Sequence, residues 1–230
     1  MRFVVQARMQ SSRLPGKVLA DLGGQPLLEH VVNRLTAACR AVGGQLVIAT
    51  STARADDAIA DFCRRRGTDC FRGSEQDVLG RFVEATADLP DEAIAVRATA
   101  DNPFYCPRRA ADIVAEHRRR QNEYTCIAGL SYVVPEVMNA GSLRAMARLA
   151  SDERCREHVT PYFREAVHSF RASQLPDRWQ GLRPEIRLTV DTPAELEQMA
   201  AICRVLARPD GLFPLEDIYA YFSTHPEHAI

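Results

Sequence analysis

Short apolar runs alternate with segments of helical period along most of the chain. The runs predicted as strands cover residues 3–7, 46–49, 70–71, 93–99, 125–128 and 186–190. The segments predicted as helices cover residues 26–42, 55–66, 76–87, 108–119, 142–149, 193–206 and 215–222. This alternation is typical of βαβ units, and it predicts an α/β fold with a Rossmann-like, mainly parallel sheet and flanking helices.

Residues at the ends of these segments indicate where helices begin and end. Gly43 and Gly67 follow the first two helices, where glycine accepts the left-handed conformation of a C-cap. Thr192-Pro193-Ala194-Glu195 has the pattern of a capping box with proline at the first helical position, so a helix is expected to begin directly after residue 191. An alternative role for Ser74, besides ligand binding, is to cap the helix over 76–87.

One stretch interrupts the alternation. Residues 167–182 hold the only tryptophan among polar and proline residues, and we expect them to form a small antiparallel excursion or hairpin. With 230 residues, of which 46% are hydrophobic, the chain has the length and apolar content of one domain over 1–230.

Composition and charge exclude several classes of protein. The formal net charge of −1 gives no reason to expect binding to nucleic acid or to a membrane surface. The apolar runs are too short to span a bilayer, and the first residues enter a strand-like segment without a cleavable signal, so we expect a cytoplasmic protein. The seven cysteines are dispersed with no Cys-x-x-Cys pair, which favours reduced thiols over a disulfide framework or a zinc site.

A basic loop follows the first predicted strand. Arg8, Arg13 and Lys17 lie within it, and Pro15-Gly16 suits the two central positions of a type II turn that would bring two of these cations together. Ligands bind at the carboxyl ends of strands in open α/β sheets, and clustered cations there suit a triphosphate. The alternative is a solvated basic surface loop; neither a Walker loop nor a G-x-G-x-x-G fingerprint is present.

Two aspartates follow two of the predicted strands. Asp101 comes after 93–99 and Asp191 after 186–190, so both are expected at the edge that holds the basic loop. Mg²⁺ takes one or two carboxylates together with substrate phosphates, and this pair meets that requirement. The alternative for Asp191 is an anion that stabilises a helix start. Because two close carboxylates repel each other, neutralising either is expected to leave stability unchanged or slightly higher.

One further block is a candidate for the same site. The block Arg72–Asp77 precedes a helix, and its glycine and the free N–H groups of the helix start suit an anionic ligand. The alternative is simple N-capping by Ser74, with Asp77 at the N3 position, and this local role can coexist with binding.

Five blocks of the sequence, in order, resemble the CMP-sugar synthetase superfamily of cytidylyltransferases. They are Ala7–Leu19, which reads Ala-Arg-Met-Gln-Ser-Ser-Arg-Leu-Pro-Gly-Lys-Val-Leu, and then Phe71–Leu79, Arg97–Phe104, Arg156–Tyr162 and Arg187–Pro193. The likeness is greatest to the branch named for the spore coat polysaccharide biosynthesis protein F, and it also covers the acylneuraminate and 3-deoxy-manno-octulosonate enzymes. Relatives often carry Gly-Leu-Asp-Val-Glu where this chain has Ser131–Val137. Its Glu136 matches the final acidic position, but the aspartate is missing, which leaves the acceptor open.

The resemblance implies an enzyme that uses CTP and Mg²⁺ to activate an acidic sugar or similar anionic acceptor for cell-surface polysaccharide synthesis. It implies that the metal ligands are Asp101 and Asp191 and that the catalytic cations are Arg8, Arg13 and Lys17. The implied nucleotide-binding residues are Gln6, Ala7, Arg8, Ser11, Ser12, Arg13, Lys17, Arg72, Gly73 and Ser74. The implied acceptor-binding residues are Asp77, Arg97, Thr99, Glu136 and His158. For His158 the implied contact is with the acceptor or a phosphate, and the alternative is a hydrogen-bonded structural histidine. The resemblance further implies a homodimer, with 130–182 as the candidate for a dimerisation or acceptor-binding excursion.

The predicted reaction is in-line attack of an acceptor oxygen on the α-phosphorus of CTP, with release of pyrophosphate. Positioning and electrostatics supply most of the catalysis in phosphoryl transfer, and no side chain is identified as a dedicated general base. Two other functions remain open. A glycosyltransferase on a related α/β fold would need an Asp-x-Asp triplet, which is absent. The other is a non-catalytic nucleotide-binding protein. The presence of both aspartates and all three loop cations argues against it, because binding alone would not require them.

Overall fold

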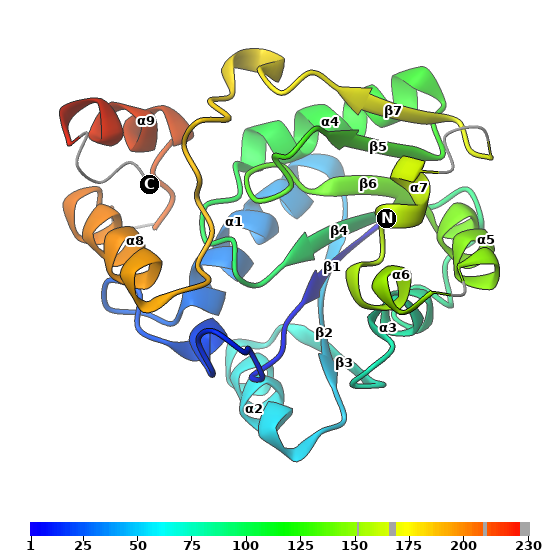
Figure 1. Ribbon diagram of the computed structural model, residues 1–230, viewed down its shortest axis with the longest axis horizontal. Coiled ribbons are helices and arrows are strands. Elements are labelled where there is room, and N and C mark those ends of the chain that lie inside the picture. The colour runs from blue at the N-terminus through cyan, green and yellow to red at the C-terminus, as the bar shows by residue number, and fades with distance from the viewer. Residues whose placement is uncertain (151, 166–168, 209–210, 226–230) are drawn as a thin grey trace.

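The computed structural model describes residues 1–150, 152–165, 169–208 and 211–225. Seven strands form one sheet in its centre, with helices on both faces (Figure 1). The strands are β1 Arg2–Gln6, β2 Gln45–Ser51, β3 Asp69–Gly73, β4 Ile94–Thr99, β5 Tyr124–Ile127, β6 Glu136–Asn139 and β7 Ala172–Leu175. The α-helices are α1 Leu27–Val42, α2 Asp57–Arg66, α3 Val78–Glu84, α4 Pro107–Arg120, α5 Ala140–Leu149, α6 Glu153–His158, α7 Pro161–Glu165, α8 Pro193–Val205 and α9 Leu215–Thr224. Short 3₁₀ turns, η1 Lys17–Leu19, η2 Arg54–Asp56 and η3 Trp179–Gly181, join some of them.

The strand order is β3-β2-β1-β4-β6-β5-β7. β1 pairs in parallel with β2 and with β4, and β2 with β3. Of the described strands, β6 alone runs antiparallel to its neighbours, β4 and β5. The predicted fold class, a mainly parallel sheet with flanking helices and a small antiparallel element, is confirmed.

The sheet separates two apolar layers because side chains alternate between the faces of a strand. Phe3 and Val5 of β1 pack into the layer formed with α1, α2, α4, α8 and α9. Val4, between them, packs into the layer formed with α3, α5 and α7. All three side chains are fully buried, so β1 is the central strand that fixes the start of the basic loop.

Local end signals predict the helices well. Gly43 and Gly67 adopt the left-handed conformation, with φ of 71° and 67°, directly after α1 and α2. The capping box is present, since the side chains of Thr192 and Glu195 each accept a backbone N–H of the other's residue. One cap was assigned to the wrong residue: α3 begins at Val78 and is capped by Asp77, which accepts from the N–H of Gly80 at 2.8 Å.

Residues 186–190 do not form the predicted strand. Their apolar side chains Ile186, Leu188 and Val190 are buried, which produces the strand-like pattern. However, β6 occupies the position beside β4, so this segment crosses the carboxyl ends of the strands on its way to α8 (Figure 1). The N–H of Val190 donates to the carbonyl of Asp101 at 2.9 Å, and side chains of Lys17 and Tyr132 donate to the carbonyls of Val190 and Ile186 at 2.7 Å and 3.2 Å, so the segment is fixed there.

The expected hairpin over 167–182 is also wrong within the described residues; residues 167–168 lie outside them. Ala172–Leu175 forms β7, which pairs in parallel with β5 at the end of the sheet. The antiparallel strand is β6, whose four residues were not predicted as a strand, and the short helices α6 and α7 were likewise missed.

In the part of the chain that the structure describes, no helix is long and apolar enough to cross a membrane. All seven cysteines are free, and six of them are buried.

Candidate active site

A cleft of about 620 Å³ opens at the carboxyl ends of β1 and β4. Eleven of the residues predicted from the sequence line it: Gln6, Arg8, Ser11, Ser12, Arg13, Lys17, Arg97, Thr99, Asp101, His158 and Asp191. Six others do not line it: Ala7, Arg72, Gly73, Ser74, Asp77 and Glu136. The cleft therefore brings the basic loop and both aspartates together from segments far apart in sequence.

The basic loop is held by two backbone features. Gly16 has φ 76° and ψ 3°, and the N–H of Lys17 donates to the carbonyl of Leu14 at 3.2 Å, which is the predicted type II turn. Upstream, the buried carboxylate of Asp56 accepts from the N–H of Met9 at 2.7 Å. Sequence reasoning missed Asp56, because nothing in its neighbourhood indicates that it reaches back to the first loop.

Lys17 joins the two aspartates directly. Its Nζ donates to Asp101 Oδ2 at 3.1 Å, to Asp191 Oδ1 at 2.8 Å and to the carbonyl of Val190 at 2.7 Å. Asp101 Oδ2 and Asp191 Oδ1 therefore lie close together, because both are within hydrogen-bonding distance of the same nitrogen atom. The side chain of Lys17 is only 9% exposed, and an ammonium has three N–H donors, so all of them are used.

Asp191 also faces two arginines. Its Oδ2 lies 2.9 Å from Arg13 Nη2 and 3.4 Å from Arg187 Nη2. Partial burial alone would raise the pKa of this carboxyl group, but the hydrogen bond from Lys17 and the charges of the three cations lower the pKa below its ordinary value. The backbone N–H of Asp191 donates to Glu195 at 2.8 Å, so the capping box also fixes the aspartate.

The expected repulsion between the two aspartates is therefore wrong. The sequence places no cation next to either residue, but the fold brings Lys17 between them and Arg13 beside Asp191. Neutralising Asp191 would remove the charged partner of Arg13 and one of the three acceptors of Lys17, so we expect it to destabilise the folded chain.

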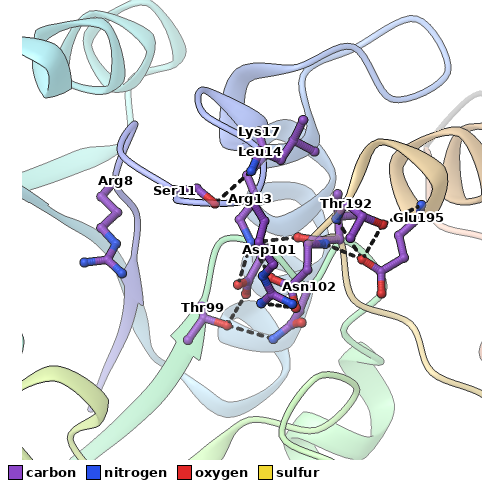
Figure 2. A network of polar contacts seen from close by, with 12 residues as sticks. Arg8, Ser11, Arg13, Leu14, Lys17, Thr99, Asp101, Asn102, Thr192 and Glu195 are labelled. Atoms are coloured by element: carbon purple, nitrogen blue, oxygen red, sulfur yellow. Dashed lines mark hydrogen bonds and ion pairs between the residues drawn. The ribbon is translucent and has the colours of Figure 1, made fainter. Parts of the chain in front are cut away.

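A short polar chain orients Asp101. Thr99 Oγ1 donates to Asp101 Oδ1 at 2.6 Å, and the side-chain amide of Asn102 donates to Thr99 at 2.7 Å (Figure 2). The hydroxyl of the buried Tyr105 accepts from the N–H of Thr99 at 2.9 Å. Thr99 thus supports a carboxylate, although it also lines the cleft.

Arg8 stands apart from this cluster (Figure 2). Its Nη2 lies 3.1 Å from Glu157 Oε1 of α6, and both side chains are about two-fifths exposed, at 41% and 43%. All three predicted loop cations are thus paired with carboxylates across the cleft. Glu157 and Arg187 were not named as site residues, although each lies in one of the family-like blocks.

Glu136 lies behind the cleft wall, in a buried network. Its carboxylate is 1% exposed and accepts from Arg97 Nη1 at 2.6 Å, from the Tyr124 hydroxyl at 2.6 Å and from Thr160 Oγ1 at 3.1 Å. Arg164 also pairs with it. Arg97 is the member of this network that lines the cleft. Direct contact of Glu136 with an acceptor is therefore not supported. Instead, Glu136 fixes the position of the Arg97 guanidinium at the cleft wall.

The block at residues 72–77 is likewise occupied with structural contacts. Arg72 donates to the carbonyl oxygens of Ser51 at 2.9 Å and Ala53 at 3.1 Å, and pairs with Asp57 at 2.7 Å. Gly73 lets the side chain of Arg81 pack closely, since a Cβ there would lie 3.0 Å from it. These contacts do not support direct binding of a ligand.

Ser74 and Asp77 contribute to the same local structure. The hydroxyl of Ser74 accepts from the N–H of Asp77 at 3.1 Å. Asp77, besides capping α3, pairs with Arg156 of α6 at 3.2 Å. The alternative of simple capping thus describes this helix start better than the binding role.

His158 lies at the cleft on an unusual backbone turn. The next residue, Val159, has φ 66° and ψ −57°, and the N–H of Thr160 donates to the carbonyl of His158 at 2.8 Å. This is a classic γ-turn, which is rare and strained for a β-branched residue. The His158 ring is exposed and hydrogen-bonds to no other described residue, so the structural alternative is not supported.

The donor set at the paired aspartates fits a hard divalent cation. Within the described residues there is no cluster of three or more Asp, Glu, His or Cys side chains that could hold a metal alone. Mg²⁺ needs only one or two carboxylates when phosphates and water complete its shell. The two carboxylates already share one cation, the Lys17 ammonium, so they are close enough to share a metal ion, which would take the place of that ammonium.

Comparison with known proteins decides the family. The family profile described as Cytidylyltransferase matches residues 2–209. The chain belongs to the cytidylyltransferase family. Members use CTP as the nucleotide donor, so this cytidylyltransferase is a CTP-dependent nucleotidyltransferase.

Individual relatives agree with this assignment. The cytidylyltransferase is 37% identical to the spore coat polysaccharide biosynthesis protein SpsF of Bacillus subtilis, over 90% of this chain and 88% of that protein. It is 35% identical to the 3-deoxy-manno-octulosonate cytidylyltransferase of Idiomarina loihiensis, over 50% of this chain and 46% of that protein. A solved cytidylyltransferase from Leptospira borgpetersenii has the same fold, with a TM-score of 0.86 and 23% identity, over 99% of this chain and 95% of that one.

Proposed function

We propose that this cytidylyltransferase transfers CMP from CTP to an acidic sugar, or to a similar anionic acceptor, for the synthesis of a surface polysaccharide. The observation that carries the proposal is the convergence of Lys17, Asp101 and Asp191 with the basic loop in one cleft. The names of the relatives support the acceptor class, since one acts in polysaccharide biosynthesis and another on a sugar acid.

In this mechanism, Arg8, Arg13 and Lys17 exchange their carboxylate partners for phosphate oxygens of CTP. Their charges hold the triphosphate in line and stabilise the pyrophosphate as it leaves. An acceptor oxygen forms a bond to the α-phosphorus, and the bond from that phosphorus to the bridging oxygen breaks. The proton of the acceptor hydroxyl passes to solvent, and the products are the CMP conjugate and pyrophosphate.

Asp101 and Asp191 would hold Mg²⁺ in this proposal. When bound, the ion supplies charge neutralisation at the phosphate oxygens and orients the reacting groups. The chain's own contribution is to fix both carboxylates, through Thr99 for Asp101 and through Glu195 for Asp191.

The acceptor is expected to lie against the wall formed by Arg97 and His158. Arg97 keeps one nitrogen on Glu136 and faces the cleft, and a guanidinium is suited to a carboxylate. His158 has no competing side-chain partner among the described residues. These two groups support an anionic acceptor over a neutral sugar.

Two further properties belong to the proposal. We expect a homodimer, with the segment 130–182 as the dimerisation or acceptor-binding part of a single domain over 1–230. We also expect the enzyme to act in the cytoplasm, which the seven free thiols support, because reducing compartments keep cysteines in this form.

The test is an acceptor screen with CTP, Mg²⁺ and a panel of sugar acids that includes octulosonic and nonulosonic acids, with the matching neutral sugars as controls. Pyrophosphate release is expected only with acids, and the product mass should equal acceptor plus CMP less water. Release with neutral sugars at equal rates would contradict the acceptor class.

A further inference from the structure

The four carboxylate oxygens of Asp101 and Asp191 are all engaged by side chains of the protein. Asp101 Oδ1 accepts from Thr99, and Asp101 Oδ2 and Asp191 Oδ1 accept from Lys17. Asp191 Oδ2 is paired with Arg13 and more weakly with Arg187. A cation placed between the two aspartates would therefore compete with Lys17 for Asp101 Oδ2 and Asp191 Oδ1.

Lys17 is the donor that occupies the space between the two carboxylates. Its backbone is fixed by the Gly16 turn, its side chain is 9% exposed, and its three donors have acceptors at 2.7–3.1 Å. A divalent ion at the same point would meet a positive charge within contact distance, which is strongly unfavourable in a partly buried site. The ammonium and the metal therefore exclude each other.

The balance of charge around the two aspartates also disfavours a metal ion there. Two carboxylates face three cationic side chains, those of Lys17, Arg13 and Arg187. In this arrangement the two aspartates offer a divalent ion no excess of negative charge. A triphosphate carries several negative charges and can take both Lys17 and Arg13 from the aspartates, which removes the barrier to the metal.

We propose that Lys17 acts as a built-in counter-ion that closes the metal site until CTP binds. CTP draws the Lys17 ammonium onto its phosphates and thereby exposes Asp101 and Asp191 to the metal. Binding of the nucleotide and of the metal is then positively coupled, and the coupling is reciprocal: each raises the affinity for the other by the same factor. Couplings of this kind are typically about 5–150-fold. The inference does not depend on the identity of the acceptor.

The experiment is a titration of Mn²⁺, followed by its electron paramagnetic resonance signal, into the full chain without nucleotide. Wild-type protein is expected to bind Mn²⁺ weakly. Lys17→Met keeps the unbranched apolar stem of the side chain but removes the charged ammonium, and the variant should bind Mn²⁺ about 5–150-fold more tightly. Adding Asp101→Asn to this variant should abolish the gain, which places the ion at the aspartate pair.

Arg8→Met is the matched control. It removes the same charge from the same loop, but Arg8 pairs with Glu157 and contacts neither aspartate. Its Mn²⁺ affinity should stay near the wild-type value, whereas an equal gain would mean that the overall charge of the cleft, and not Lys17, closes the site. A Lys17→Met gain that survives Asp101→Asn would place the metal elsewhere. Either result overturns the proposal.

The wild-type protein supplies a second measurement that no unstable variant can confound. Water-proton relaxation distinguishes Mn²⁺ in the protein–CTP complex from Mn²⁺ bound to free CTP. The affinity of the CTP-saturated protein for Mn²⁺ should exceed that of the free protein by a factor in the same range. If the free protein binds Mn²⁺ at the aspartates as tightly as the CTP complex does, Lys17 does not close the site. An inactive acceptor screen would leave both measurements intact.

Discussion

Glu136→Gln tests whether the buried network behind the cleft wall depends on a charged carboxylate. Every partner of Glu136 donates to it: Arg97, Arg164, Tyr124 and Thr160. Glutamine has nearly the same volume, but it replaces one acceptor oxygen with a donor NH₂ group and removes the charge that balances two guanidinium groups. At least one donor is then left facing another donor in a buried site.

The structure gives the size of the effect. Burial alone would raise the pKa of Glu136, but the charges of Arg97 and Arg164 and the hydrogen bond from Tyr124 lower it from 4.5 to about 2. At 1.36 kcal/mol per pKa unit, the charged form contributes about 3 kcal/mol to the free energy of unfolding at neutral pH. Removing one partner of a buried pair costs about 3–5 kcal/mol, and because Arg164 is 43% exposed we take the lower value.

The measurement is urea unfolding followed by circular dichroism, for both proteins, from pH 7.5 down to pH 3. At pH 7.5 the variant should lose about 3 kcal/mol, or roughly 6–12 °C in Tm for a chain of this size. Because the pKa of Glu136 is lower in the folded state, its contribution is complete above about pH 4.5 and is lost as the pH falls towards about 2. The stability difference between the two proteins should therefore shrink below pH 4.5.

Glu116→Gln is the matched control. The hydrogen bonds from Arg119 and Arg120 also lower the pKa of Glu116 to about 2, but this pairing lies on the surface of α4, with arginines that are 65% and 42% exposed. Surface pairs contribute about 0–1 kcal/mol, so this variant should unfold almost as wild type does. Equal losses in the two variants, or a Glu136→Gln difference that does not change with pH, would refute the reasoning.

Three other predictions concern the site and the assembly. Asp101→Asn and Asp191→Asn should each abolish metal-dependent pyrophosphate release, and the double variant should lose little more, because residues acting as one unit are not additive; independent, additive losses would contradict a shared site. Calorimetry with four nucleotides and Mg²⁺ should rank CTP first, since a pocket built to hydrogen-bond an exocyclic amine penalises a base that lacks it; tighter GTP binding would favour a guanylyltransferase. Light scattering should give a dimer, and a monomer at every concentration would reject that expectation.

The parts of the fold that were predicted correctly depend on local rules. Gly16 accepts φ > 0 after a proline, so the turn that carries Lys17 follows from the sequence alone. The capping box fixes the start of α8 and, with it, the backbone of Asp191. The alternation of strand-like and helix-like periods also predicts where β1 and β4 end, and therefore where the basic loop begins and where Asp101 lies.

The parts that were missed depend on contacts between distant segments. Residues 186–190 have the burial pattern of a strand, but the sheet has no place for them once β6 pairs with β4. The network of Glu136 joins β4, β6 and α7, and no spacing in the sequence indicates that Arg97 and Arg164 meet there. The bridge formed by Lys17 spans more than 80 residues to Asp101 and more than 170 to Asp191.

The position of β6 has a consequence for how the chain folds. β3, β2, β1 and β4 pair with one another through residues that all precede residue 100, so this half of the sheet can assemble early in synthesis. β5 is the next strand in sequence, after α4, but among the described residues it is joined to that half of the sheet only through β6, which is made later. Until residues 136–139 insert, the exposed edge of β4 can pair with other chains. Insertion of this four-residue strand is therefore the step that joins the two halves and ends the period in which the nascent chain can aggregate through that edge.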